Sequence, residues 1–417
     1  MMSWLREQIK RIGGSQRGRQ APNLDYPLLL SVAGLLFIGL IAVYSSTFDR
    51  SYQAWANLAK EWSRQFLWAG LGLVVLVGFA LLPYNLWRKY AIPIFGGGVL
   101  MLLLILLIAK PLYGSRRTFI SGSIQPSEFV KLATVIYVAT WLTSKQDRIR
   151  NITYGVLPFA MMIGFVAGLI VAQPDLSTGI LIVVTASAMF FIAGADLLQI
   201  GIGAVGLGGV LYVLINSIAH AQERVDQYLA VLKDPLQAHH HTKHALIAIG
   251  SGGFFGVGLG QGQQKLGYLP LSHTDSIFAI IAEEMGFVGC FAVIVLYAIL
   301  TYRGFRIAAR AREPFAGLLA SGITCTITFQ AMINIAVMLA LLPMTGISLP
   351  FISSGGSNLL VSLAGIGILL SIARGNHSKN LKRKKGTSQH ANLDRRWGNR
   401  GTRVSRPRRR TGAKSHR

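Results

Sequence analysis

Charged residues are scarce in this sequence. Only 14% of its 417 residues are Asp, Glu, Lys or Arg, whereas 52% are hydrophobic. A soluble protein of this length needs more charged surface, so the composition excludes a pair of soluble domains. Together with a mean hydropathy of +0.48, it predicts a membrane protein whose chain crosses the bilayer many times.

Cysteine is also rare, and several common site motifs are missing. Cys290 and Cys325 both lie in apolar segments, which excludes a disulfide framework and a cysteine-based metal site. The sequence has no Walker A motif, no Asp-x-Asp pair and no defensible Ser/His/Asp arrangement. No small-residue cleavage site follows a short apolar core near the N-terminus, so we predict that the first apolar segment is retained as a helix.

Acidic residues number 16 against 41 basic ones, which gives a net charge of +25. Sixteen of the basic residues lie in the last 44 positions, from Arg374 onward. We interpret residues 376–417 as a disordered cytoplasmic tail that is attracted to anionic membrane lipids. Nucleic-acid binding is the alternative, but no nucleic-acid fold or interleaved aromatic pattern accompanies the charge.

Ten apolar segments have lengths near the roughly 20 residues that a bilayer-spanning helix needs. They lie at about 27–47, 66–83, 91–110, 127–143, 154–172, 178–194, 197–219, 276–301, 315–341 and 350–373. Basic residues concentrate in the loops that share a side with the N-terminus, which places both termini in the cytoplasm. The predicted fold class is all-α: a basic cytoplasmic segment (1–24), a ten-helix membrane domain (25–375) and the tail.

One long loop, residues 220–275, is predicted outside the cytoplasm between helices 7 and 8. Its apolar stretch 245–259 is too short to cross a bilayer, so we expect a re-entrant or interfacial helix. Gly252, Gly256 and Gly260 recur every four residues and would form one smooth face of that helix. Such a face suits close helix packing, or a bare backbone that admits a lipid chain or a phosphate.

The long loop ends at a lone carboxylate, Asp275, directly before an apolar helix. Charge at the edge of hydrocarbon is costly and is usually kept for a function. The positive end of the helix dipole at this position favours the ionised carboxylate. We therefore predict that Asp275 is a catalytic residue that accepts a proton.

Three further acidic or basic side chains stand near the ends of predicted helices. Glu128 and Lys131 are three residues apart and share a helix face. They are expected to form an ion pair that neutralises both charges, or one that also shapes a cavity or steers a charged substrate. Asp175 is expected to cap the helix that follows it, and a position at the outer aqueous face leaves a substrate contact open.

Polar residues inside the later helices are expected to bond between helices. Glu283 and Glu284 point about 100° apart on a helix, so we do not expect both to face one cavity, and one of them is predicted to pair. Gln330 and Asn334 are predicted interhelical hydrogen bonders. A histidine cluster in the long loop is interpreted as solvated and polar, with metal binding as the alternative. The cluster consists of His239, His240, His241 and His244.

Nine ordered motifs run from Asp25 to about Gly375. They are VYSS at 43–46, GSRR at 114–117, QPSEFVKL at 125–132, QPDLST at 173–178, AIGSGG at 248–253, QKLGYLP at 264–270, HTD at 273–275, AEEMG at 282–286 and LPFISSGGS at 349–357. In this order they resemble the SEDS family (shape, elongation, division and sporulation), the membrane glycan polymerases that include FtsW and RodA. The QKLGYLP elbow is more similar to FtsW than to RodA.

The resemblance implies a ten-helix protein of the bacterial inner membrane that polymerises lipid II, an undecaprenyl-pyrophosphate disaccharide pentapeptide, into peptidoglycan strands. It also implies partners: a class B penicillin-binding transpeptidase and other division or elongation proteins. Asp275 matches the family's essential aspartate, and Glu128, Lys131 and Asp175 match positions that the family needs. Substrate contacts are expected from Arg116, Arg117, Lys265, His273 and Asp175.

The sequence also departs from the family pattern. The family usually has Glu where Leu271 stands, Phe where Ser276 stands and Tyr where Ser354 stands. Its usual Gly-Tyr-Gln stretch before the glycine-rich segment is replaced around the histidines. These departures concern the geometry of the elbow and the partner surface more than the chemistry.

The sequence thus predicts a peptidoglycan glycosyltransferase with Asp275 as general base. The pyrophosphate leaving group needs cations, supplied by Arg116, Arg117, Lys265 or a divalent metal such as Mg²⁺ or Mn²⁺. One alternative is a lipid II flippase, which polar groups inside the helix bundle would suit equally well. The other is a non-catalytic scaffold that recruits division proteins.

Overall fold

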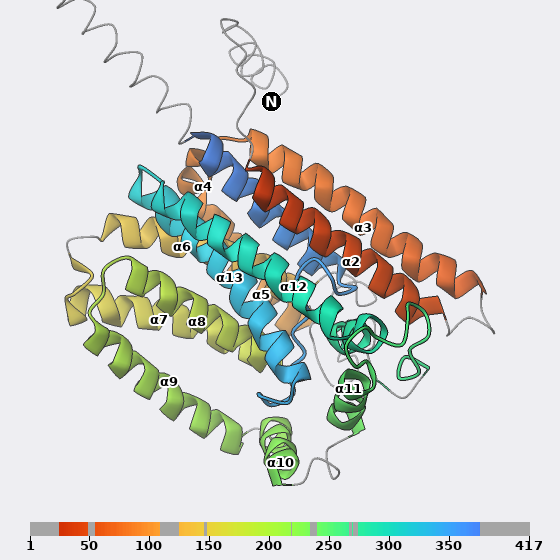
Figure 1. Ribbon diagram of the computed structural model, residues 1–417. Coiled ribbons are helices and arrows are strands. Elements are labelled where there is room, and N and C mark those ends of the chain that lie inside the picture. The colour runs from red at the N-terminus through yellow and green to blue at the C-terminus, as the bar shows by residue number, and fades with distance from the viewer. Residues whose placement is uncertain are drawn as a thin grey trace, which may run out of the picture.

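The computed structural model describes residues 25–48, 55–108, 125–145, 148–217, 219–233, 240–266, 269 and 274–375. These residues are helical with connecting turns, and no strand occurs among them (Figure 1). Seven of the described helices are long and apolar enough to cross a membrane. The chain is therefore a multi-pass, all-α membrane protein, as predicted.

The seven long apolar helices correspond to seven of the ten predicted segments. They are Tyr26–Ser46 in α2 (Tyr26–Phe48), Ser63–Leu81 in α3 (Trp55–Leu81), Ile152–Val171 in η3 (Ile152–Val156) and α7 (Leu157–Val171), α9 (Leu197–Ser217), α12 (Ile277–Ala309), α13 (Pro314–Met338) and the last helix, Gly356–Gly375. The predicted segments 1–24 and 376–417 lie outside the described residues.

Three further helices match the remaining predicted segments: α5 (Ala91–Ile108), α6 (Pro126–Ser144) and α8 (Leu176–Ile192). A five-residue helix, α4 (Asn85–Lys89), connects α3 to α5. Helix α6 packs against α5, α8 and α13, and most of its residues are buried by protein. Its polar side chains therefore face other helices, which is where charged groups are tolerated at membrane depth.

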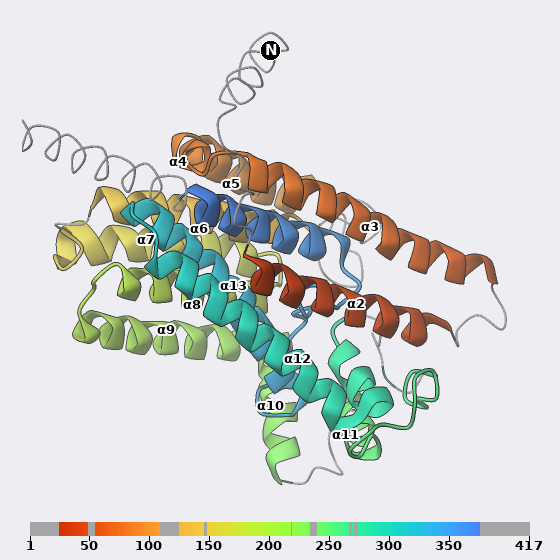
Figure 2. The ribbon, with the colours of Figure 1, turned by 45° about the horizontal axis from the view of Figure 1, so that its top comes forward.

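Helices α12 and α13 lie in the middle of the bundle (Figures 1 and 2). Helix α12 packs against α13 and α2, and α13 packs against α6 and α8. The apolar window of the last helix is 83% buried inside the protein, whereas that of α9 is 0% buried. The last helix is thus part of the core, and α9 presents its apolar side chains to lipid.

Two polar contacts join α2 to α12 near opposite ends of the pair. At one end, Arg303 donates to both carboxylate oxygens of Asp25, at 2.8 and 2.6 Å. At the other end, Ser45 donates to Glu284 at 2.6 Å. The second contact lies close to the start of α12, where α11 (His240–Ser251) packs against α12 (Figure 1). Helix α10 (Ala219–Lys233), which precedes α11 in the chain, packs against α9.

The glycine-rich segment after α11 is not the helix that its spacing suggested. Helix α11 ends at Ser251, and Gly253, Gly256, Gly258 and Gly260 all have positive φ. The prediction of a smooth helical face is therefore wrong beyond Ser251. Close packing is nevertheless present, because a Cβ atom on Gly256 would clash with the carbonyl oxygen of Glu284.

This segment fills a break in α12 at Gly286, whose φ and ψ are 65° and −160°. The break removes the two helical bonds that would join 287 to 283 and 288 to 284. The carbonyls of Glu283 and Glu284 instead accept from Val257 and Gly258 at 3.0 and 3.1 Å. The amides of residues 287 and 288 donate to the carbonyls of residues 253 and 254 at 3.0 and 3.2 Å. Irregular backbone is tolerated at membrane depth when protein satisfies it in this way.

We expect Gly256→Ala to destabilise the protein more than Gly260→Ala. The two glycines have nearly equal φ, 82° and 83°, so both variants share a backbone strain of about 1–2 kcal/mol. Only the alanine at 256 also meets backbone atoms of α12, because nothing lies within 4 Å of a Cβ at 260. Thermal unfolding in detergent measures the difference, and equal losses in the two variants would contradict the packing described.

Candidate active site

Asp275 lies in the turn 274–276 that leads into α12. Asp275 is half-buried, whereas the next residue, Ser276, is fully buried and forms the N-cap of α12. The amide of Asn334 in α13 donates to the carbonyl oxygen of Asp275 at 2.8 Å and to that of Ile347 at 2.7 Å. Asn334 therefore bonds beyond its own helix, but to backbone outside the helices rather than to another helix as predicted, and it fixes the backbone of the turn that holds Asp275.

Both adjacent glutamates of α12 hold the elbow that precedes this turn. Glu283 accepts hydrogen bonds from the backbone amides of Gln263 and Gln264 at 2.7 and 3.2 Å. Glu284 pairs with Lys265 at 2.9 Å. The predicted pairing of one glutamate is confirmed for Glu284. The prediction that the two side chains do not face one cavity stays a prediction, and both contact residues 263–265, Glu283 through backbone amides and Glu284 through Lys265.

Lys265 is fully buried, and its ammonium has three acceptors: Glu284 at 2.9 Å, the carbonyl of Gly260 at 2.8 Å and Ser45 at 3.1 Å. An ammonium has three donor hydrogens, so these contacts occupy all of them. The expectation that Lys265 contacts a pyrophosphate does not fit this arrangement. The side chain instead ties the elbow to α2 and α12.

The predicted ion pair in α6 is present and buried. Lys131 lies 2.8 Å from Glu128, and their side chains are 4% and 7% exposed. Lys131 also donates to Gln330 of α13 at 2.7 Å. Gln330 in turn donates to Asn358 at 3.1 Å and to the carbonyl oxygen of Ser348 at 2.9 Å. The pair therefore belongs to a polar network that joins α6, α13 and the last helix.

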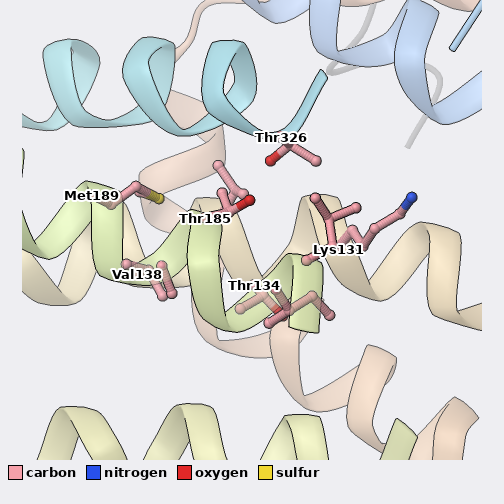
Figure 3. Close-up of a pocket in the computed structure, with 10 residues that line it drawn as sticks. Lys131, Thr134, Val138, Thr185, Met189 and Thr326 are labelled. Atoms are coloured by element: carbon pink, nitrogen blue, oxygen red, sulfur yellow. The ribbon is translucent and has the colours of Figure 1, made fainter. Parts of the chain in front are cut away.

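Two adjoining cavities flank Lys131 within the bundle. Figure 3 shows Thr185 and Thr326 on one of them, with Met189 and Val138 toward its far end. The buried hydroxyls of Thr134 and Thr185 have no hydrogen-bond partner among the described residues. The second cavity is lined by further polar residues, which are Glu128, Thr326, Gln330, Asn358 and Ser362. A few polar groups thus reach two small cavities whose lining is otherwise apolar.

We expect Glu128→Gln or Lys131→Met to lower the stability of the protein markedly. Removing one partner leaves the other charge uncompensated in a buried site, which costs on the order of 3–5 kcal/mol. The double variant removes both charges and should regain part of that loss. Thermal unfolding in detergent is the measurement, and single variants as stable as the wild type would show that the pair is solvated.

Asp175 caps α8, as predicted. Its carboxylate accepts from the amide of Thr178 at 3.3 Å, and it also accepts from Gln125 at 3.0 Å and Ser127 at 3.4 Å. The residue is 6% exposed. It therefore links the starts of α6 and α8, while its predicted contact with substrate stays a prediction. Arg116, Arg117 and His273 lie outside the described residues, so their predicted contacts also stay predictions.

His241 is a site residue that the sequence analysis missed. It is 8% exposed, and its Nε2 lies 2.6 Å from the hydroxyl oxygen of Ser276, next to Asp275. The interpretation of the histidine cluster as solvated is wrong at this position, because 241 is on the inner face of α11. His240 and His244 do share a helix face, with ring centroids 4.3 Å apart. The described part of the chain contains no group of three or more His, Cys, Asp or Glu residues placed to hold a metal.

Comparison with known families supports this architecture over nearly the whole membrane region. The model of the cell cycle protein family FtsW/RodA/SpoVE matches residues 26–378. The chain belongs to this family. The match covers every helix described above, so the elbow, the α12 break and the Asp275 turn all lie within the family's shared region.

Curated relatives of this FtsW/RodA/SpoVE protein span most of its length. It is 37% identical to a probable peptidoglycan glycosyltransferase FtsW of Trichlorobacter lovleyi, over 84% of this chain and 93% of the relative. It is 39% identical to stage V sporulation protein E of Bacillus subtilis, over 84% of this chain and 97% of the relative.

Solved structures show the same fold. A chain of a peptidoglycan synthase complex that coordinates polymerization and crosslinking superposes with a TM-score of 0.69 at 27% identity, covering 85% of this chain and 98% of that chain. The rod shape determining protein RodA of Thermus thermophilus superposes with a TM-score of 0.63 at 27% identity, covering 84% and 97%.

Proposed function

We propose that this FtsW/RodA/SpoVE protein is a peptidoglycan glycosyltransferase that polymerises lipid II into glycan strands. The observation that supports it most directly is the Asp275 turn. A half-buried carboxylate stands on a backbone held by α13, beside a fully buried N-cap residue. Curated relatives named as peptidoglycan glycosyltransferases agree with this reaction.

In this proposal Asp275 is the general base. The acceptor is the 4-hydroxyl of an N-acetylglucosamine unit, whose oxygen attacks the anomeric carbon of a polyprenyl-pyrophosphate-linked disaccharide. Asp275 takes the hydroxyl proton as the new glycosidic bond forms. The pyrophosphate leaves with the electrons of the broken bond and needs no protein acid, so one carboxylate suffices where glycoside hydrolysis uses two. Attack opposite the leaving group inverts the anomeric carbon and gives a β linkage from an α-linked donor.

The leaving pyrophosphate needs positive charge nearby. Arg116 and Arg117 are proposed to supply it, because paired guanidinium groups bind phosphate through several donors at once. Lys265 is not included, since its ammonium is buried against Glu284. His273 and Asp175 are proposed to contact the sugar or peptide part of the substrate.

A divalent cation such as Mg²⁺ or Mn²⁺ is the other proposed source of positive charge. Mg²⁺ is commonly held by one or two carboxylates together with substrate phosphates and water. Asp275, a single half-buried carboxylate, would hold such a cation as an alternative to its role as general base, and metal titration of Asp275→Glu separates the two roles. When bound, the cation would neutralise charge on the departing pyrophosphate.

We propose a position in the bacterial inner membrane with both termini in the cytoplasm, which the distribution of basic residues favours. The proposed partners are a membrane-anchored class B penicillin-binding transpeptidase and other division or elongation proteins. The similarity to a chain from a polymerization and crosslinking complex supports a transpeptidase partner. Membrane lipids are expected to contact α9 and the basic tail.

A lipid II flippase is the second candidate, because charged and polar groups inside the helix bundle, such as the Glu128–Lys131 pair, would suit a transporter as well. Purified protein in liposomes with labelled lipid II, with and without its transpeptidase, separates the possibilities. Glycan strands are the result that the proposal predicts. Movement of lipid II across the bilayer without strands would establish the flippase instead, and neither activity would leave a scaffold.

A further inference from the structure

We propose that His241 is a positioning residue that, through Ser276, holds the turn of Asp275 in its catalytic geometry. This inference rests on the proposed role of Asp275 as general base. His241 belongs to α11, and Ser276 is the last residue before α12. The contact therefore ties the turn to a helix residue that is 35 positions earlier in the chain.

The two ring nitrogens of His241 have different partners, and these partners determine which nitrogen carries the hydrogen. Nδ1 lies 3.2 Å from the sulfur of Met344, and Nε2 lies 2.6 Å from the hydroxyl oxygen of Ser276. A thioether sulfur only accepts hydrogen bonds, so Nδ1 carries the hydrogen. In the neutral ring Nε2 is then an acceptor, and the hydroxyl of Ser276 donates to it.

Ser276 uses its hydroxyl in an unusual way for its position. Serine at a helix N-cap normally accepts a hydrogen bond from an amide in the first turn of its own helix. Ser276 is the N-cap of α12, yet its side chain makes no such bond. The hydroxyl is directed to His241 instead, at a site where both residues are at least 92% buried. A local rule that is broken in a buried site marks a constraint from elsewhere in the fold.

The second anchor of the turn comes from α13. Asn334 of α13 holds the carbonyl of Asp275, as described above. The loop that provides Met344 is itself held by α10, because Tyr228 donates to the carbonyl of Leu341 at 2.9 Å and Arg224 to that of Met344 at 3.4 Å. Asp275 therefore lies half-exposed in a turn that Asn334 holds at the Asp275 carbonyl and His241 holds at Ser276.

Loosening this turn is expected to slow the chemical step. Misplacement of a catalytic group by about 1 Å can cost on the order of 10²-fold in rate. His241→Ala is expected to lower kcat for strand formation about 10- to 100-fold, with KM for lipid II little changed because His241 does not touch substrate in the proposal. Ser276→Ala, which removes a single oxygen atom, is expected to lower kcat in the same way.

The test compares His241→Ala, Ser276→Ala and the double variant, all assayed as purified protein with labelled lipid II. His240→Ala is the matched control, because this exposed residue is the neighbour of 241 on the same helix. The double variant should be no slower than the slower single variant, since both remove one bond. His241→Gln should recover most of the rate, because its amide can accept from Ser276.

A wild-type kcat in both His241→Ala and Ser276→Ala would overturn the inference. A double variant whose loss is the product of the two single losses would also overturn it, since the residues would then act independently. Asp275→Asn is assayed beside them. If it forms strands at the wild-type rate, the proposed function of Asp275 has failed; if it is inactive while the His241 and Ser276 variants are normal, only this inference has failed.

Discussion

Lys265→Met is expected to lower the free energy of unfolding by about 3–5 kcal/mol, because it leaves a buried carboxylate without its cation. Lys265 is fully buried and the side chain of Glu284 is 2% exposed. After the substitution Glu284 keeps only the hydroxyl of Ser45 among its described partners. Thermal unfolding in detergent measures the loss.

The controls for this variant use the same chemistry elsewhere. Lys243→Met on α11 removes an ammonium from a more exposed position, and it should change stability little. The double variant Lys265→Met/Glu284→Gln removes both charges and should regain part of the loss. A single Lys265→Met variant as stable as the wild type would mean that the elbow is held by other contacts.

Asp275→Asn is expected to keep the fold and to reduce strand formation at least about 10²-fold. Asparagine has nearly the same shape as aspartate, and the carbonyl that Asn334 holds is unchanged. The amide cannot take the proton of the acceptor hydroxyl, so the reaction loses its base. The initial rate of glycan formation from labelled lipid II is the measurement.

Asp226→Asn is the matched control for Asp275→Asn. Asp226 is an exposed residue of α10, in the same predicted outer loop. The Asp226→Asn variant removes one carboxylate from that loop and leaves the carboxylate in the turn before α12 in place. Its strand formation should match the wild type, which would separate a specific role of Asp275 from a general effect of charge.

Local sequence patterns predicted most of the helical framework. The lengths of the apolar segments predicted the helices, because a membrane helix satisfies its own backbone hydrogen bonds and needs only about 20 apolar residues. The i,i+3 spacing of Glu128 and Lys131 predicted their pair, and the position of Asp175 directly before an apolar segment predicted its cap. These features depend on residues a few positions apart, which a sequence shows directly.

Features that depend on distant residues were not predictable in the same way. In the sequence, Gly286 looks like an ordinary glycine within an apolar helix. The helix breaks there because the backbone of residues 253–258 supplies the missing hydrogen bonds. Lys265 resembled a substrate-binding cation because its partner, Glu284, is 19 residues away around the elbow. His241 looked solvated because its partner belongs to the start of another helix.

The measurement that tests the central claim most directly is strand formation by purified wild-type and Asp275→Asn proteins, side by side in liposomes with labelled lipid II and the transpeptidase. The account predicts glycan strands from the wild type and almost none from the variant, with equal thermal stability. Strands formed by Asp275→Asn at a rate near the wild type would contradict it, and would remove this turn from the active site.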